Sequence, residues 1–185
     1  MPPEIKTDRR TMIDGAIDII EERGFDALSA RSLAEKLGIS TQPIYREFGD
    51  MDGVRKATVE RGWQVFADYV KGEAEAQAVR YVTFAAEHKN LFIFLFRNRN
   101  CEYSGLDDMS HKLVEGTGII DMLSSITGLT REKTYRLHLV LWMALHGLAS
   151  MCADNEVKID GDEIRDFTVQ TTKALAAFYR KEGGV

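Results

Sequence analysis

Apolar residues in the first fifty positions recur every three or four residues, which is the spacing of amphipathic helices. This spacing predicts a first helix over residues 8–23, ended by Gly24. A second helix is predicted from Ser29, a residue type that favours the N-cap position, to Leu37. Gly38 then permits the left-handed backbone of a tight turn. The first helix is expected to bury Ile13, Ala16, Ile17 and Ile20.

The residues after this turn predict a third, short helix with one polar and one apolar face. Ser40 and Thr41 offer side-chain oxygens to its first N–H groups, and Pro43 suits its first turn. Ile44 and Phe48 are expected to face the core. Two helices joined by a glycine-containing turn form a helix-turn-helix, whose second helix enters the major groove of DNA; an ordinary helical hairpin is the alternative. The outward face is expected to carry Thr41, Gln42, Tyr45 and Arg46.

The remaining pattern predicts helices only, so the expected fold class is all-α with about nine helices. Asp50 or Asp52 can cap the fourth helix. The apolar run LFIFLF at residues 91–96 suits a deeply buried short helix better than a strand, because its flanks are helical. The predicted helices after the third cover residues 51–75, 76–88, 91–96, 106–126, 130–155 and 162–181.

The helix predicted over residues 130–155 is apolar on every side and therefore needs cover on every side. We expect one of its stripes to meet a second subunit, with Leu141 at that interface. Together with the last helix, it predicts a homodimer held by a four-helix interface. The two stripes are Leu137, Val140, Leu141, Ala144, Leu145 and Leu148, and Leu139, Trp142, Met143 and His146; the last helix adds Ile164, Phe167, Thr171, Leu175 and Phe178.

One set of residues in the first three predicted helices and their turns carries a resemblance to a known family. It comprises Ile13, Ala16, Ile17, Gly24, Phe25, Leu28, Ser29, Leu33, Ala34, Leu37, Gly38, Ile39, Ser40, Ile44, Tyr45 and Phe48. On these residues, about a quarter of the chain resembles the N-terminal domain of the tetracycline-repressor (TetR) family of bacterial transcription regulators. The resemblance implies a DNA-binding domain over residues 1–50 and a helical ligand-binding and dimerisation domain over residues 51–185. It also implies that a helix at about 51–75 links the two domains and moves when ligand binds.

The resemblance and the side-chain chemistry together indicate a set of DNA-binding residues. Gln42 has the groups to pair with N6 and N7 of adenine, whereas the helix that begins after Ser29 is expected near a phosphate. The family often has a phosphate-contacting lysine where this chain has Met51, so Arg55 or Lys56 is expected to replace it. Lys6, Arg9 and Arg10 are expected near the DNA backbone or in a solvated basic segment. The full set is Ser29, Arg31, Ser40, Thr41, Gln42, Pro43, Tyr45, Arg46 and Lys56.

Acidic residues exceed basic ones, which argues against a non-specific nucleic-acid binder. The chain carries a net charge of −5, and residues 1–62 hold ten Lys or Arg against twelve Asp or Glu, a net of −2. Because a basic domain is the usual footprint of a DNA-binding protein, this balance supports an alternative function. The alternative is a helical small-molecule-binding or interaction protein without sequence-specific DNA binding. For a DNA-binding protein, we expect weak non-specific binding and dependence on base contacts.

The sequence contains no motif that indicates catalysis or a cofactor. Its four histidines are scattered, and the GTG at residues 116–118 lacks the preceding strand and the third glycine of a nucleotide-binding loop. We therefore expect a binding protein rather than an enzyme, and no metal or cofactor. Aromatic and sulphur-containing candidates for the effector pocket favour a small, largely apolar or aromatic ligand. They are Tyr81, Phe84, Phe96, Tyr103, His111, Trp142, Met143 and His146.

Simple features of the sequence predict the cellular compartment of the protein. Cys101 and Cys152 have no metal-type or redox-motif spacing, which suits a reducing cytoplasm. The N-terminal segment lacks the apolar core of a signal peptide. No apolar run approaches the ~18 residues that a membrane-spanning helix needs. We expect a cytoplasmic, TetR-like repressor that is released from a palindromic DNA operator by its effector.

Overall fold

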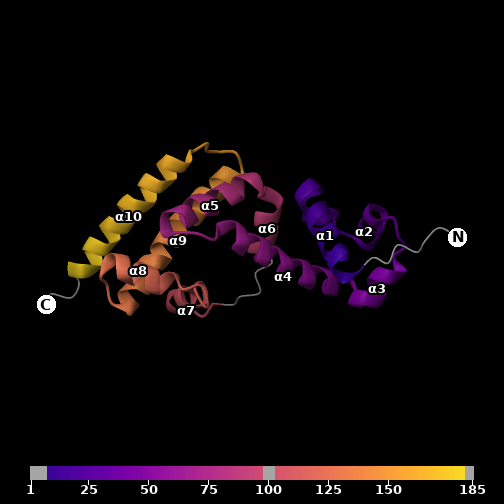
Figure 1. Cartoon of the computed structure of the whole chain (residues 1–185), viewed down its shortest axis with the longest axis horizontal. Coiled ribbons are helices and arrows are strands. Elements are labelled where there is room, and N and C mark those ends of the chain that lie inside the picture. Colours follow the sequence, from indigo (N-terminus) through magenta and orange to yellow (C-terminus); the bar gives the residue numbers. More distant parts are fainter. Residues whose placement is uncertain (1–7, 98–102, 182–185) are drawn as a thin grey trace. The chain divides into compact units, whose positions relative to one another are not determined.

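The structure is a computed structural model that describes residues 8–97 and 103–181 (Figure 1). Within these ranges it contains α-helices and one 3-10 helix and no strand, which confirms the all-α prediction. The described residues form two compact units, one from residues 8–69 and 88–97 and the other from residues 70–87 and 103–181. The helices are α1 (Arg9–Arg23), η1 (Phe25–Ala27), α2 (Ala30–Leu37), α3 (Gln42–Phe48), α4 (Met51–Val70), α5 (Ala74–Glu87), α6 (Lys89–Arg97), α7 (Leu106–Lys112), α8 (Ile119–Thr127), α9 (Arg131–Ala153) and α10 (Gly161–Lys181).

Most predicted helices occur within a few residues of their predicted ends, and one prediction was wrong. The single helix expected over residues 106–126 is two helices, α7 and α8. Gly116 and Gly118 lie between them with φ angles of +73° and +70°, a left-handed backbone that ends a right-handed helix. The fourth helix also stops earlier than predicted, at Val70.

The first unit is built around α1, which packs against α2, η1 and α6. Ala16, Ile19 and Ile20 of α1 are fully buried, as are Leu33 of α2 and Ile44 of α3. A local signal explains where α1 begins, because the Asp8 side chain accepts a hydrogen bond from the Thr11 N–H at 2.8 Å. The same capping hydrogen bond lowers the pKa of the Asp8 carboxyl.

Helix α6 belongs to the first unit although it follows α5 in the chain. Asn90 donates a hydrogen bond to the Glu21 carbonyl at 2.9 Å, and His88 lies 2.7 Å from the Glu21 carboxylate. The predicted deep burial of residues 91–96 holds for four of the six, since two remain partly exposed. Gly62 of α4 permits close packing here, because an added Cβ would lie 2.8 Å from the Leu95 side chain.

The second unit is a helical bundle in which α5 packs against both α9 and α10. Its apolar core includes Leu123 of α8, Leu137 of α9 and Tyr179 of α10. Helix α9 is the one described helix long and apolar enough to cross a membrane by length and composition. Since the core helices of soluble proteins pass the same test and 44% of its apolar stretch is buried, this is weak support for a span.

The exposed apolar face of α9 differs from the face that the pattern predicts. Leu141 is buried within its own unit, so the expectation that it lies at a subunit interface was wrong. Val140, Met143 and Met151 are instead 41%, 44% and 42% exposed, and Gly147 lies between them on the same face. Helix α10 leaves Phe167 and Phe178 exposed, together with Ala174.

Candidate DNA interface and ligand cavity

The N-terminus of α2 is held in one orientation by reciprocal hydrogen bonds. The Ser29 hydroxyl accepts from the Ser32 N–H at 3.1 Å, and the Ser29 N–H donates to the Ser32 hydroxyl at 2.9 Å. This capping box confirms Ser29 as the predicted N-cap. Both Ser29 and Arg31 remain exposed, so this end of α2 is available to an anion such as a phosphate.

The turn between α2 and α3 has the predicted left-handed glycine. Gly38 has φ +65° and ψ +31°, and the Ile39 N–H donates to the Ala34 carbonyl at 3.0 Å. The expected side-chain cap of α3 does not form, because the Thr41 side chain makes no capping hydrogen bond. The Thr41 carbonyl accepts from the Ile44 and Tyr45 N–H groups instead. The Thr41 hydroxyl is therefore not engaged in capping the helix.

Helix α3 presents the polar face that its sequence predicts. Ile44 is fully buried and Pro43 lies in the first turn. Gln42 and Arg46 are exposed, and 46% of Tyr45 is exposed. Gln42 lies three residues before Tyr45 and four before Arg46, so these side chains share one accessible face of the helix. Every predicted DNA-binding residue lies in the first unit, and all are exposed or partly exposed: Ser29, Arg31, Ser40, Thr41, Gln42, Pro43, Tyr45, Arg46 and Lys56.

Ion pairs within the first unit place cations beside several of its acidic residues. Lys36 lies 2.9 Å from Glu22 and 3.5 Å from Asp18, and the hydrogen bond to Glu22 raises the pKa of the lysine. Asp14 pairs with Arg10 and Arg61. Asp14, Asp18 and Glu22 of α1 therefore each lie beside a cation.

Three basic residues of α2 to α4 form no ion pair with any residue that the structure describes. They are Arg31, Arg46 and Lys56, all exposed. Arg55 is engaged, because its guanidinium lies 2.9 Å from the Asp52 carboxylate and 5.4 Å from the Phe25 ring centroid. The uncommitted positive charge of these helices thus lies at three of the predicted DNA-binding positions, despite the acidic total.

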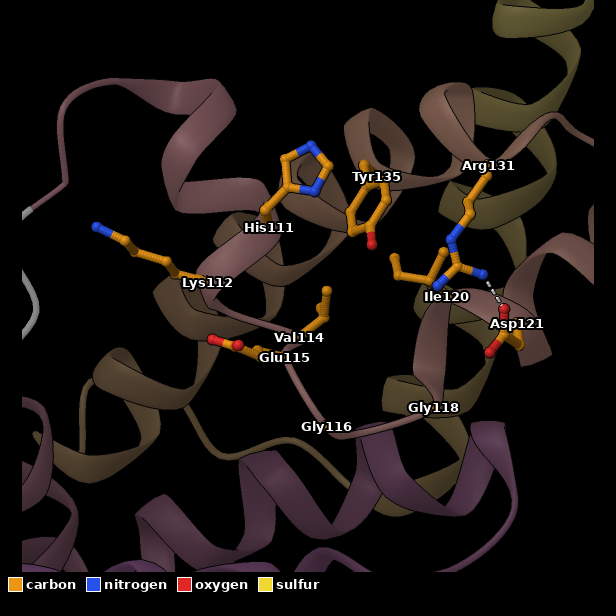
Figure 2. A pocket seen from close by; sticks show the side chains of 10 residues that line it. All are labelled: His111, Lys112, Val114, Glu115, Gly116, Gly118, Ile120, Asp121, Arg131 and Tyr135. Atoms are coloured by element: carbon orange, nitrogen blue, oxygen red, sulfur yellow. Dashed lines mark hydrogen bonds and ion pairs between the residues drawn. The ribbon is translucent and has the colours of Figure 1, made fainter.

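A cavity of about 550 Å³ lies in the second unit among α7, α8 and the N-terminal end of α9 (Figure 2). One wall is aromatic, since the His111 and Tyr135 rings lie 3.9 Å apart between centroids. Figure 2 shows the Tyr135 hydroxyl directed toward the space beside Val114 and Ile120. The lining is His111, Lys112, Val114, Glu115, Gly116, Gly118, Ile120, Asp121, Arg131 and Tyr135.

Each end of this cavity carries one cationic and one acidic side chain. The Arg131 guanidinium is hydrogen-bonded to Asp121, which raises the pKa of the arginine. Figure 2 shows Lys112 and Glu115 extending away from this pair. The lining holds two cationic and two acidic side chains, and Lys112 also lies 2.9 Å from the Asp108 carboxylate. The cavity therefore suits a largely uncharged ligand with polar groups at its ends.

The N-terminal domain matches a known family model. Residues 12–58 match the model described as bacterial regulatory proteins of the tetR family, the segment that contains α2, α3 and the start of α4. An uncharacterized HTH-type transcriptional regulator from Mycobacterium tuberculosis is 26% identical over 156 residues, which cover 77% of this chain and 68% of the relative. Residues 12–58 therefore form a TetR-type DNA-binding domain.

Solved structures share the fold of the whole chain. A protein of unknown function from Rhodococcus sp. RHA1 is 21% identical with a TM-score of 0.73, covering 95% of this chain and 100% of that one. A TetR-like transcriptional regulator from the same organism is 20% identical with a TM-score of 0.58, covering 95% of this chain and 96% of that one. At these identities the likeness shows the fold alone.

The structure distributes the predicted ligand-binding residues over several places in the TetR-type fold. His111 lines the cavity. A second group lies on α5 and α9, where the Tyr81 hydroxyl is 2.8 Å from His146 Nδ1 and the Trp142 ring stacks on His146 at 4.9 Å. The others are apart: Phe84 is fully buried in the second unit, Phe96 belongs to the first unit, Tyr103 is partly buried before α7, and Met143 is on the exposed face of α9.

Sequence reasoning missed the cavity residues contributed by α8 and α9. Arg131 and Tyr135 stand four residues apart at the start of a long helix, which places them on one face. That spacing was visible, but their orientation toward α7 depends on the break at Gly116 and Gly118.

Proposed function

We propose that this TetR-type regulator is a cytoplasmic homodimer that represses transcription from a roughly palindromic operator and is released by a small, largely apolar or aromatic effector. The accessible face of α3, with Gln42, Tyr45 and Arg46, carries this proposal. Gln42 suits a base edge, and Tyr45 and Arg46 suit phosphates. Lys56 is the better candidate for the phosphate contact that Met51 cannot make, because Arg55 pairs with Asp52. The regulator acts by binding and performs no catalysis.

The exposed apolar faces of α9 and α10 support dimerisation. Val140, Met143 and Met151 would be left in water in a monomer, as would Phe167 and Phe178. These two helices pack against each other within the unit. Gly147 lies in the middle of the α9 face, and nothing within 4 Å would meet its Cβ, so a partner helix can approach closely there. We propose that a second copy of the chain covers both faces.

The effector is proposed to bind in the second unit, in the cavity beside α7. The aromatic wall of His111 and Tyr135 favours a planar ligand, and Val114 and Ile120 supply apolar contacts. Binding can release DNA only if the effector prefers the state whose recognition helices do not fit the operator. The spacing required for DNA binding is about 34–36 Å between the two recognition helices, one turn of the duplex.

Selection of binding sites from a random DNA pool tests the proposed function. The expected product is an inverted repeat whose half-sites are centred about one helical turn apart. A pool without enriched sequence would favour the alternative, a helical small-molecule-binding or interaction protein without sequence-specific DNA binding. Enrichment of a single half-site would contradict the dimer but retain DNA recognition.

Substitution of Gln42 tests its proposed contact with a base. We expect Gln42→Ala to cost ~1–3 kcal/mol in specific binding and to relax preference at one base pair of each half-site. Binding to unrelated DNA should change little, because Gln42 carries no charge. The measurement is fluorescence anisotropy with the selected operator and its single-base variants. Unaltered selectivity at every base pair would remove Gln42 from base recognition.

Two tyrosine variants distinguish the possible effector sites. A thermal-shift screen of small aromatic compounds first provides a ligand. Tyr135→Ala removes part of the cavity wall and should weaken that ligand about tenfold or more while operator binding remains. Tyr81→Phe removes only the hydroxyl that hydrogen-bonds to His146. It serves as the matched variant for the group of Tyr81, Trp142 and His146. Weakening by Tyr81→Phe alone would move the effector to the Tyr81, Trp142 and His146 group.

A further inference from the structure

The recognition helix α3 has few contacts of its own that set its direction. It contains seven residues, has no side-chain N-cap, and buries only Ile44 among its residues. A helix this short is marginal in isolation, so its orientation depends on the tertiary contacts of its ends. Base recognition requires a constant orientation, because hydrogen bonds to base edges tolerate little displacement.

Arg9, the first residue of α1, contacts the C-terminal end of α3 through three different groups. Its Nη1 donates to the Glu47 carbonyl at 3.3 Å and lies 3.4 Å from the Glu47 carboxylate. Its guanidinium carbon is 4.5 Å from the centroid of the Phe48 ring. One side chain thus connects α1 to a helix that is 38 residues away in the sequence.

We propose that Arg9 is a positioning residue that holds the C-terminal end of α3 against α1, so that Gln42 meets the bases at a constant angle. The inference rests on the proposed sequence-specific DNA binding. It differs from the sequence-based expectation that Arg9 lies near the DNA backbone, because the guanidinium is directed at α3 itself.

The chemistry of each contact suits this role. The Glu47 carbonyl is among the last four of α3, which lack partners within the helix, and a cation is favoured at that end. The planar guanidinium can lie over Phe48 while donating to Glu47, which a lysine ammonium does less well. Arg9 itself is anchored, since Asp8 caps α1 and the next turns of α1 are buried in the core.

The Glu47 carboxylate is expected to matter less than its carbonyl. The side chains of Arg9 and Glu47 are 50% and 42% exposed, and ion pairs between exposed groups contribute little. Glu47→Gln keeps the carbonyl and leaves Phe48 in place. This variant should therefore retain the operator selectivity of the wild type.

Salt dependence distinguishes positioning from a phosphate contact. Each lost phosphate contact lowers the slope of log affinity against log salt by about 0.9, so a contact in both subunits would lower it by about 2. A positioning residue leaves the slope unchanged and lowers only the ratio of operator affinity to non-operator affinity. A purely structural residue lowers the thermal midpoint but leaves this ratio unchanged in the folded protein.

The first experiment measures operator and non-operator affinity over a series of salt concentrations. Arg9→Ala should lower the affinity ratio about tenfold with an unchanged slope, and Arg9→Lys should lower it several-fold although its charge is kept. The matched control is Arg23→Ala, since Arg23 is exposed and lies in the last turn of α1, whereas Arg9 is its first residue. An unchanged ratio, a slope reduced by about 2, or full recovery in Arg9→Lys would overturn the proposal.

The second experiment needs no DNA and therefore separates this inference from the proposed function. Amide hydrogen exchange in the free protein should become several-fold faster in α3 for Arg9→Ala, including the Gly49 N–H that donates to the Tyr45 carbonyl. Amides of α2 should keep their wild-type rates. If the wild type selects no operator but this loosening occurs, the proposed function fails and the positioning contact stands. Unchanged exchange in α3 would overturn the contact itself.

Discussion

Met143→Glu should convert the dimer into monomers and lower operator affinity by about 100-fold or more. Met143 is 44% exposed on the face of α9 where the second copy is proposed. In a dimer, the new carboxylate would be buried without a partner, whereas in a monomer it stays in water. A dimer binds both half-sites of the operator at once, so its affinity exceeds that of one subunit for one half-site. Separated subunits lose this increase in affinity.

A matched variant shows whether this effect belongs to the interface. Ile126 is 62% exposed on α8 and lies outside the α9 and α10 faces. Ile126→Glu introduces the same charge and should leave both the dimer and operator binding unchanged. The measurement is sedimentation velocity over a range of protein concentrations. A Met143→Glu protein that remains dimeric would place the interface elsewhere.

Between pH 7 and pH 5 the wild type should lose about 2 kcal/mol of its free energy of unfolding through His138, and His138→Leu should abolish this loss. His138 is 6% exposed, its Nδ1 has no hydrogen-bond partner among the described residues, and burial lowers its pKa to about 4. In the unfolded chain the histidine has its ordinary pKa of about 6.5. Below pH 6.5, the unfolded chain therefore binds a proton that the folded chain does not bind. The free energy of unfolding thus decreases as the pH is lowered from 6.5 toward 4.

Urea unfolding at several pH values measures this effect. Carboxylates also titrate at low pH, but their contribution is shared by wild type and variant and cancels in the difference. His111→Gln is the matched control, because His111 is exposed and should leave the wild-type loss intact. An equal loss of stability in His138→Leu and wild type would show that His138 takes up its proton without unfolding.

Local signals were sufficient to predict α1 to α3. Ser29 and Gly38 determine the ends of α2 through hydrogen bonds that span at most five residues. Pro43 and the spacing of Ile44 predict where α3 begins and which side is buried. The outward face of α3, and with it the candidate DNA interface, follows from the same short range of sequence.

Features that depend on distant contacts could not be predicted in this way. Helix α9 is apolar all round, so its pattern alone did not show that Leu141 is buried by its own unit and Met143 is not. The placement of α6 with the first unit depends on Glu21, which is 69 residues from Asn90. The contact of Arg9 with Glu47 is likewise invisible in the sequence, because it joins two helices through a turn and a third helix.

Affinity for an operator with altered half-site spacing tests the central claim most directly. The selected operator is compared with a version whose half-sites are moved apart by five base pairs, which places them on opposite sides of the duplex. We predict that this change removes nearly all preference over unrelated DNA, since two copies of α3 in one dimer can no longer reach both sites. Equal affinity for the selected operator, the respaced operator and unrelated DNA would contradict the account.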